Sequence, residues 1–212
     1  MKHYSQAYQD LFAIQMTKQK RNGYFIELGA HHPITCNNTF LLENDYQWRG
    51  LMVEYNTSFE ALYQQHRPLS IYQVKDATQV DYHTLFQLNN YPKDLDYLQI
   101  DLDVDNRSTL NALELLDNTV FDDYRFATVT FEHDFYVGDY YQTRAQSRAI
   151  FQKRGYRLLF PDVLVNYAGG WNAFEDWYVH PDLVDNNIVN QLTTGLSLRC
   201  DDIKTMLMNL TF

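Results

Sequence analysis

The chain has 212 residues, of which 45% are hydrophobic and 21% charged, with 8 Gly and 5 Pro, and this composition excludes disordered, collagen-like and low-complexity architectures. Lys and Arg total 17 against 27 for Asp and Glu, so the net charge of −10 disfavours nucleic acid and anionic membranes as partners. The length is that of one domain, which we expect to span residues 1–212.

Neither the cysteines nor the apolar segments indicate secretion or membrane insertion. Cys36 and Cys200 lie far apart in the sequence and form no metal-type pair, and two thiols make no disulfide scaffold. Residues 1–10 lack the apolar core of a signal peptide, and no stretch reaches the ~18 apolar residues of a membrane span. We therefore expect a soluble protein of the cytoplasm.

Short apolar runs alternate with longer mixed segments, which predicts strands alternating with helices in a mainly parallel sheet with helices on both faces. A helix within residues 5–20 comes first, and the core follows over 23–180. The expected strands lie at 24–28, 50–54, 70–74, 97–100, 126–131, 156–160 and 177–179. The expected helices between them lie at 39–44, 58–66, 81–88, 108–116 and 142–153. The sequence thus predicts a seven-stranded α/β fold.

The alternation changes after residue 156. Residues 162–174 contain Gly169-Gly170 and show no strong helical period, so we expect a loop there and an antiparallel pair of strands at the sheet edge. The tail, residues 182–212, is polar except for one apolar stripe. Such a stripe predicts a helix packed on the domain or on a second copy of the chain.

The ends of the first two expected strands suggest a ligand site. In doubly wound sheets, ligands bind at the carboxyl end of the first strand, here Glu27-Leu28-Gly29-Ala30. Gly29 is not followed by the further glycines that a diphosphate requires. Glu54 ends the second strand, where a carboxylate suits the two hydroxyls of a ribose. These features predict a site for a nucleoside without phosphates, such as S-adenosylmethionine (SAM), whose cationic groups acidic neighbours favour.

Ordered motifs cover residues 5 to about 180. In chain order they are Ser5-Gln6-x-x-Gln9-Asp10, Phe25-Ile26-Glu27-Leu28-Gly29-Ala30-x-x-Pro33, Asn38-Thr39, Leu42-Glu43, Trp48-Arg49-Gly50, Val53-Glu54, Leu98-Gln99-Ile100-Asp101, Thr130-Phe131-Glu132-His133, Gly155-Tyr156 and Phe174-Glu175-Asp176-Trp177. This series resembles the FkbM-type branch of SAM-dependent methyltransferases. The resemblance implies a Rossmann-like class I methyltransferase fold whose last strand is antiparallel. It also implies methyl transfer to an oxygen, often a hydroxyl of a sugar or sugar-bearing metabolite.

The resemblance further implies a SAM site made by the strand ends and the N-terminal segment. Its residues would be Glu27, Gly29 and Ala30 at the methionine end, Glu54 at the ribose, Asp76 and Ala77 at the adenine, Asp101 at the sulfonium, and Gln6, Gln9 and Asp10 as a closing wall. Many relatives have Asp in place of Glu27 and Asn-containing loops in place of His31-His32, so the grip on the amino-acid end differs here. We expect these two histidines to be loop residues near the cofactor, since no ligand pair has zinc spacing.

Methyl transfer is an in-line displacement that requires positioning and removal of the hydroxyl proton. His133 follows the fifth expected strand, and an ordinary histidine pKa of roughly 6.5 suits a general base. We therefore assign catalysis to His133 together with Asp101.

Several acids crowd the ends of the fourth and fifth expected strands, and such carboxylates repel one another unless protons or a cation neutralise them. These acids are Asp101, Asp103, Glu132 and Asp134. One hypothesis is a Mg²⁺ ion held by Asp101, Glu132 and either His133 or Asp134, since some sugar O-methyltransferases of this fold use a metal there. The other is that the acids are solvated or paired with Arg144 and Arg148.

The acceptor site is expected near the start of the sixth helix. Arg144 and Arg148 lie one helical turn apart and could bind a carboxylate or phosphate of the acceptor, or pair with the acids instead. Tyr136 and Tyr140 stand where an acceptor would enter, and aromatic walls suit a sugar ring. We expect the partner to be a small molecule or a glycan.

Two other functions remain open. Asp101-Leu102-Asp103 is an Asp-x-Asp sequence after an apolar strand, as in metal-dependent nucleotide-sugar glycosyltransferases, although those enzymes usually add basic residues for the diphosphate. The chain could also be a non-catalytic interaction module that keeps a methyltransferase fold.

Overall fold

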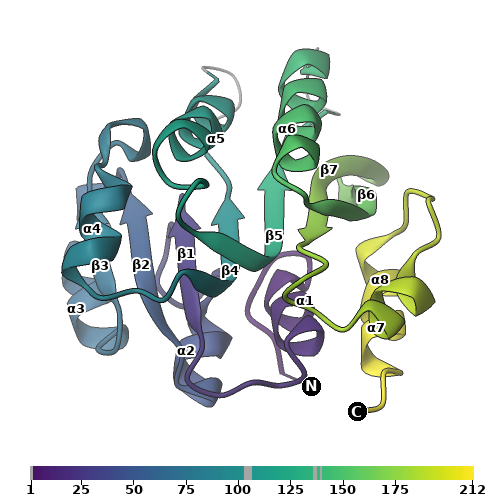
Figure 1. Ribbon diagram of the computed structural model, residues 1–212, viewed down its shortest axis with the longest axis horizontal. Helices are drawn as coiled ribbons and strands as arrows, with labels where there is room; N and C mark the ends of the chain where they lie inside the picture. The colour runs from purple at the N-terminus through teal and green to yellow at the C-terminus, as the bar shows by residue number, and fades with distance from the viewer. Residues whose placement is uncertain (1, 103–106, 136–137, 139) are drawn as a thin grey trace.

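The computed structural model describes residues 2–102, 107–135, 138 and 140–212. Its strands form a seven-stranded sheet in the order β3-β2-β1-β4-β5-β7-β6 (Figure 1). They are β1 (Tyr24–Leu28), β2 (Arg49–Glu54), β3 (Ile71–Val74), β4 (Asp94–Ile100), β5 (Arg125–Glu132), β6 (Arg157–Tyr167) and β7 (Gly170–Val179). Strands β1 to β5 are parallel to one another, and β7 runs antiparallel between β5 and β6. The predicted mainly parallel sheet with an antiparallel last strand is confirmed.

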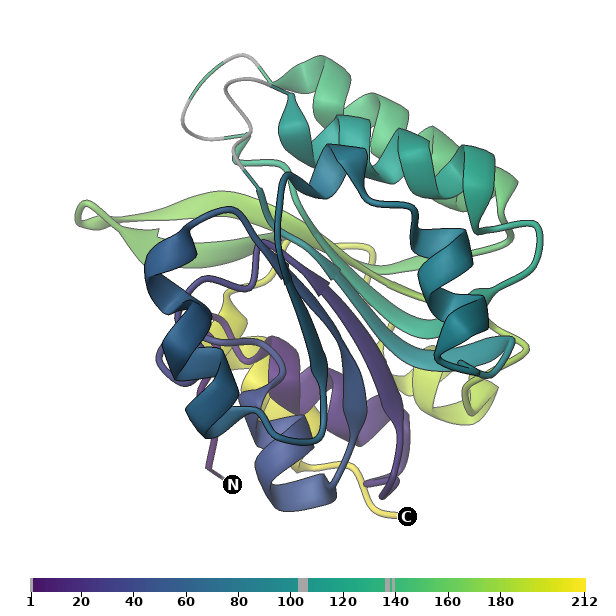
Figure 2. The same ribbon diagram turned by 90° about the vertical axis from the view of Figure 1, so that its left-hand side faces the viewer.

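Helices cover both faces of the sheet, as predicted (Figure 2). The α-helices are α1 (Gln9–Met16), α2 (Phe40–Tyr46), α3 (Glu60–His66), α4 (Tyr82–Leu88), α5 (Ser108–Thr119), α6 (Tyr141–Lys153), α7 (Asn186–Leu192) and α8 (Cys200–Met208), and the 3-10 helices are η1 (Thr57–Phe59) and η2 (Ala77–Gln79). Helices α4, α5 and α6 lie on one face, and α1, α2, α3, α7 and α8 lie on the other.

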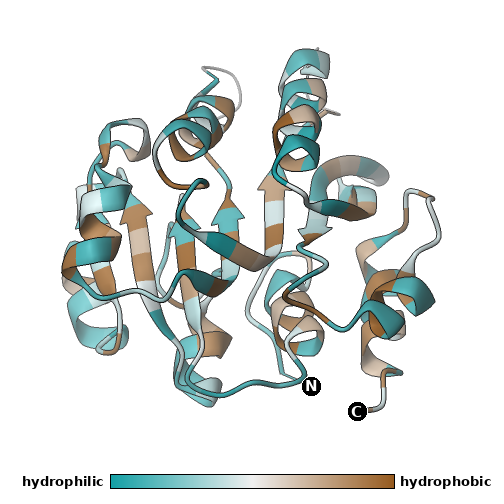
Figure 3. Ribbon diagram, viewed as in Figure 1, coloured by the Kyte–Doolittle hydropathy of each residue, from teal (hydrophilic) through white to brown (hydrophobic). Residues whose placement is uncertain are grey.

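Side-chain alternation along β1 explains which residues face which layer. Ile26 and Leu28 belong to the core that packs against α4, α5 and α6. Phe25 belongs to the core on the opposite face, with residues of α1, α2 and α3. Because successive strand residues point to opposite faces, Glu27 follows Phe25 toward the second layer. Figure 3 shows that hydrophobic residues gather on the strands in the middle of the molecule.

The N-terminal helix is shorter than the expected 5–20. Tyr8, Lys18 and Gln19 have positive φ angles of 70°, 53° and 55°, which no α-helix accommodates. The Asp10 carboxylate accepts hydrogen bonds from the Tyr4 and Ser5 N–H groups and so folds the preceding segment back on the helix. The helix therefore occupies only Gln9–Met16.

Residues 162–174 are not the expected loop but most of a long β-hairpin. Strands β6 and β7 pair from Arg157 with Val179 up to Tyr167 with Gly170, and the turn between them uses Gly169 at φ 82°. The glycines mark only this turn, and register shifts along the pairing hide the usual alternation in the sequence. Figure 2 shows the hairpin extending beyond the other strands.

The tail forms α7 and α8, and its apolar stripe packs on the domain. Ile203 and Leu207 of α8 are completely buried in a core that includes Phe12 of α1 and Trp177 of β7. No helix in the described part of the chain has both the length and the apolar character to cross a membrane.

Candidate functional site

A cavity of about 480 Å³ lies at the carboxyl ends of β1, β2 and β4. Its lining residues are Gln6, Gly29, His31, Cys36, Asn38, Glu54, Tyr55, Asp101 and Leu102. A second cavity of about 430 Å³ shares Tyr55 and Leu102 and adds Val53, Lys75, Asp76, Ala77 and Ser108. The chain turns from the β1-β2-β3 side of the sheet to the β4-β5 side at this point, which is where open α/β sheets bind ligands.

The backbone at Gly29 lies against the ends of both β2 and β4. Gly29 has φ 84°, and its N–H donates to the Val53 carbonyl at 2.9 Å. A Cβ at this position would stand 1.6 Å from the carbonyl oxygen of Asp101. Only glycine tolerates both the φ angle and this short distance, so the fold requires a glycine at position 29.

Glu54 is positioned at the end of β2 by two backbone donors. Its Oε2 accepts the His31 N–H at 2.7 Å, and its Oε1 accepts the Asn56 N–H at 2.7 Å. Each carboxylate oxygen has a further lone pair, so the half-buried side chain can accept hydrogen bonds from the hydroxyl groups of a ligand in the cavity.

Asp76 follows β3 and caps η2. Hydrogen bonds from the Thr78 hydroxyl (2.7 Å) and N–H (2.9 Å) lower the pKa of Asp76, which keeps the carboxylate ionised. Ala77, beside it, is buried, and both residues line the second cavity. The structure therefore brings together Gly29, Glu54, Asp76, Ala77 and Asp101, all of them expected from the sequence.

Asp101 is the titratable group between the strand ends. Burial raises the pKa of Asp101, and the nearby carboxylates of Asp134, Glu27 and Glu54 act in the same direction, so that the pKa reaches about 8. This carboxyl group therefore exchanges its proton close to neutral pH.

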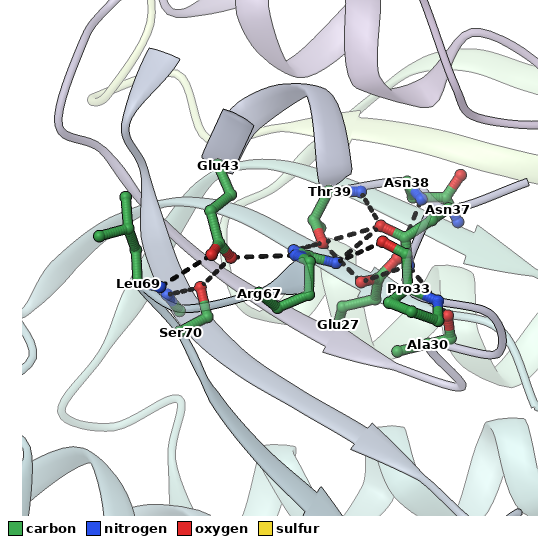
Figure 4. Close-up of polar contacts among 11 residues, drawn as sticks. Glu27, Ala30, Pro33, Asn37, Asn38, Thr39, Glu43, Arg67, Leu69 and Ser70 are labelled. Atoms are coloured by element: carbon green, nitrogen blue, oxygen red, sulfur yellow. Dashed lines mark hydrogen bonds and ion pairs between the residues drawn. The ribbon is translucent and has the colours of Figure 1, made fainter. Parts of the chain in front are cut away.

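Glu27 and Ala30, expected at the methionine end, lie behind the cavity wall. Glu27 is only 1% exposed and accepts the Thr39 hydroxyl (2.6 Å), the Asn38 N–H (3.0 Å) and the Asn37 amide (3.2 Å) (Figure 4). Burial raises the pKa of Glu27 to about 7, although Arg67 and these donors act in the opposite direction. Glu27 thus holds the loop whose residue Asn38 lines the cavity.

Gln9 and Asp10 are also buried behind the cavity. The Asp10 carboxylate accepts the Ser5 hydroxyl at 2.6 Å, and the Gln9 amide donates to Glu175 at 2.8 Å. Of the expected closing wall, Gln6 lines the cavity. Gln9 and Asp10 hold the segment that carries it.

His133, the expected general base, lies at the end of β5 but is completely buried. Its Nδ1 accepts the Phe135 N–H at 3.3 Å, which assigns the ring proton to Nε2. That Nε2 lies 3.5 Å from Asp162 and 3.6 Å from Asp176. The ring therefore faces two carboxylates and does not line the cavity, and this geometry does not fit a base for an acceptor in the cavity.

Arg144 and Arg148 pair with acids of the β6-β7 hairpin. Arg148 donates to both oxygens of Asp176, at 2.7 and 2.8 Å, and Arg144 donates to Asp162 at 2.9 Å. Burial alone would raise the pKa of Asp176, but the hydrogen bonds from Arg148 and the nearby His133 ring hold it well below the usual range. These arginines were expected either to bind the acceptor or to pair with the acids at the ends of the fourth and fifth strands. The structure shows ion pairs, but with Asp162 and Asp176 of the hairpin.

The expected metal ligands do not converge. Within the described ranges, the group that could hold a metal ion is His133, Asp162 and Asp176, and it contains neither Asp101 nor Glu132. Asp162 and Asp176 already form ion pairs with Arg148, and a cation would have to displace that guanidinium. The donor set therefore does not fit Mg²⁺.

The remaining expectations concern the acceptor side. Tyr140 immediately precedes α6 and is partly buried, but it lines neither cavity described above. Tyr136 and Asp103 lie outside the described residues. His31 lines the cavity, as expected for a loop residue near the cofactor. Sequence reasoning missed Tyr55 and Cys36; Tyr55 directly follows Glu54, and this adjacency could have identified it.

This chain is similar to known proteins in fold but not in sequence. No protein-family model matches the sequence, and no curated protein matches it. Precorrin-6y C5,15-methyltransferase from Geobacter metallireducens has a TM-score of 0.51 at 10% identity, covering 80% of this chain and 85% of that one. The 1,6-didemethyltoxoflavin-N1-methyltransferase from Burkholderia thailandensis, with bound S-adenosylhomocysteine, has a TM-score of 0.51 at 12% identity, covering 83% and 79%.

A third structure is the SAM-dependent O-methyltransferase from Thermotoga maritima, with a TM-score of 0.50 at 10% identity, covering 84% of this chain and 66% of that one. These three proteins act on different substrates or positions according to their names, and at such identities the likeness concerns architecture. The chain has the Rossmann-like fold of the class I SAM-dependent methyltransferases.

Proposed function

We propose that this protein is a SAM-dependent methyltransferase of the FkbM type that methylates a hydroxyl group of a sugar or a sugar-containing metabolite. The observation that carries the proposal is the pair of adjoining cavities at the strand ends, with Glu54 and Asp76 as carboxylates and no glycine-rich cradle for phosphates. Such a site suits an adenosine without phosphates.

The roles of the residues follow from their positions. Asp76 and Ala77 would hold the adenine, and Glu54 would accept the ribose hydroxyls. Gly29 and Asp101 lie together at the other end of the site, where both line the larger cavity. SAM would supply a methyl group on a cationic sulfonium, and the ionised carboxylates of the site favour that charge.

Asp101 is our candidate for the general base. Transfer to a hydroxyl releases a proton, and a carboxylate whose conjugate acid has a pKa of about 8 accepts it far better than an ordinary carboxylate. We assign this role to Asp101 because it lines the cavity, whereas His133 does not.

The acceptor we infer is neutral and rich in hydroxyl groups. Gln6, His31 and Asn38 offer hydrogen-bonding side chains to the larger cavity. Arg144 and Arg148 are paired with aspartates, so they are poorly suited to bind an acidic group of the acceptor.

Cys36 and Cys200 are free thiols, which supports a cytoplasmic location.

Isothermal titration calorimetry with S-adenosylhomocysteine (SAH) tests the donor site, and binding without added metal is expected. Mass spectrometry of cell extracts incubated with the protein and methyl-labelled SAM then tests the reaction, with a labelled hydroxylated small molecule or glycan as the expected product. A melting temperature of the protein that rises only with a nucleotide sugar and Mn²⁺ would favour a glycosyltransferase. Binding of SAH with no labelled product in any extract would favour a non-catalytic module.

A further inference from the structure

The wall of the larger cavity includes a loop with little regular structure of its own. This loop, residues 30–39, connects β1 to α2 and contributes His31, Cys36 and Asn38 to the cavity. His31 and Cys36 have positive φ angles of 46° and 52°, which are unfavourable for these residue types. The loop therefore needs outside contacts to keep its shape.

Arg67, just after α3, supplies three of those contacts (Figure 4). Its Nη1 donates to the Pro33 carbonyl at 3.3 Å and to the Asn37 side chain at 3.0 Å. Its Nη2 donates to the Thr39 hydroxyl at 2.7 Å, and that hydroxyl in turn donates to Glu27. One guanidinium thus reaches three points along the loop.

The guanidinium is itself held in place. Its side chain is 0% exposed, and its Nε donates to Glu43 of α2 at 3.0 Å. Glu43 also accepts the Leu69 N–H at 2.9 Å and the Ser70 hydroxyl at 2.5 Å. A buried arginine fixed on the far side by a carboxylate is a rigid support for the loop, because its planar donors are already oriented.

Tyr63 supports the loop near its start. It lies four residues before Arg67, on α3, and its hydroxyl donates to the His31 carbonyl. The tyrosine is 1% exposed, and its ring stacks on Tyr72 at 5.6 Å. The end of α3 therefore holds the loop both at His31 and over residues 33–39.

We propose that Arg67 and Tyr63 are positioning residues that hold loop 30–39 in the conformation needed to bind the amino-acid end of SAM. This inference rests on the proposed function. Neither residue lines the two cavities, so both act through the loop. The adenine cavity is lined by residues at the ends of β2, β3 and β4 and at the start of α5, and none of these belongs to the loop.

Two ligands separate positioning from a general loss of structure. SAH has the amino-acid end, and 5′-deoxy-5′-methylthioadenosine has the same nucleoside without it. Calorimetry should show that Arg67→Lys weakens SAH binding by about 10- to 100-fold, because a lysine cannot reach all three loop positions at once. Binding of methylthioadenosine should weaken clearly less than that of SAH, since the adenine cavity is intact and the nucleoside meets the loop only near Glu54.

Two further variants keep the test decisive. Tyr63→Phe removes one hydroxyl and should weaken SAH binding selectively even if Arg67→Lys does not fold. Arg154→Lys alters another arginine–carboxylate cluster, with Asp117 and Asp122, away from both cavities, and should change neither affinity.

Equal losses for both ligands, or no loss of SAH affinity in either loop-supporting variant, would overturn the inference and leave the proposed function standing. Wild-type protein that binds neither ligand would overturn both.

Discussion

The carbonyl oxygen of Asp101 occupies the space that a Cβ on Gly29 would need, with only 1.6 Å between the two positions. The ends of β1 and β4 can therefore approach each other only because residue 29 has no side chain. Gly29 and Asp101 both line the larger cavity, where the candidate donor site lies.

Gly29→Ala should unfold or strongly destabilise the protein. The substitution adds a backbone clash to an unfavourable φ angle, and we expect a loss of about 3 kcal/mol or more in the free energy of unfolding. Gly169→Ala is the matched control, since Gly169 has φ 82° and nothing within 4 Å of a Cβ, so it should cost about 1 kcal/mol. Urea unfolding measures both values, and equal costs would show that the approach to Asp101 can relax.

Glu54→Gln should weaken binding of SAH by about tenfold, because a neutral amide replaces a charged acceptor for the ribose hydroxyls. The fold should be kept, since Glu54 is only half buried. Calorimetry on the variant, beside the exposed Glu60→Gln as a control with unchanged affinity, checks this expectation. Unchanged affinity in Glu54→Gln would remove this residue from the donor site.

Asp101→Asn should lower the rate of methyl transfer by about 100-fold or more, because the amide cannot accept the hydroxyl proton. In the wild-type enzyme the rate should rise with pH up to about 8, as the Asp101 carboxyl loses its proton, and this rise should vanish in the variant. Product formation followed by mass spectrometry across this pH range tests both points. A variant with the wild-type rate and pH profile would exclude Asp101 as the base.

Glu27 should make stability depend on pH near neutrality. Its pKa of about 7 in the folded state exceeds the usual value of 4.5, so protons bind more tightly to the folded chain. The stabilisation from the protonated form is present below about pH 4.5 and is lost as pH rises through 7. Glu27→Gln cannot ionise, so its free energy of unfolding relative to wild type should increase by about 3 kcal/mol over this window. Urea unfolding at several pH values should reveal this trend, and a constant difference would contradict it.

Divalent cations should not stabilise the wild-type protein. Arg148 neutralises Asp162 and Asp176, the two carboxylates beside His133, so neither Mg²⁺ nor a chelator should shift the melting temperature. Arg148→Met leaves the buried Asp176 without its main partner and should cost about 3 kcal/mol. A rise in the wild-type melting temperature with Mg²⁺ would mean that the cation displaces the arginine.

Much of the candidate donor site could be predicted from the sequence because parallel strands end at a common edge of the sheet. Gly29 and Glu54 each follow or end an apolar run, so the strand pattern alone places these two residues together, whereas Asp76 and Asp101 were expected there from the motif resemblance. The antiparallel edge was predictable for a similar reason, since the helical period disappears after residue 156.

Local patterns could not reveal which way buried polar side chains point or what they contact. Glu27 and His133 both belong to the strand-end segments, but Glu27 faces the α2 and α3 side and meets a loop held by Arg67, while His133 is covered by the β6-β7 hairpin. Both outcomes depend on partners far away in the chain. The sequence by itself determined the succession of strands along the chain and the residues at the carboxyl ends of the parallel strands, because hydrophobic alternation and turns are local. Only the tertiary structure decided which acids face a cavity and which are paired inside, because burial and ion pairing depend on segments that folding brings together.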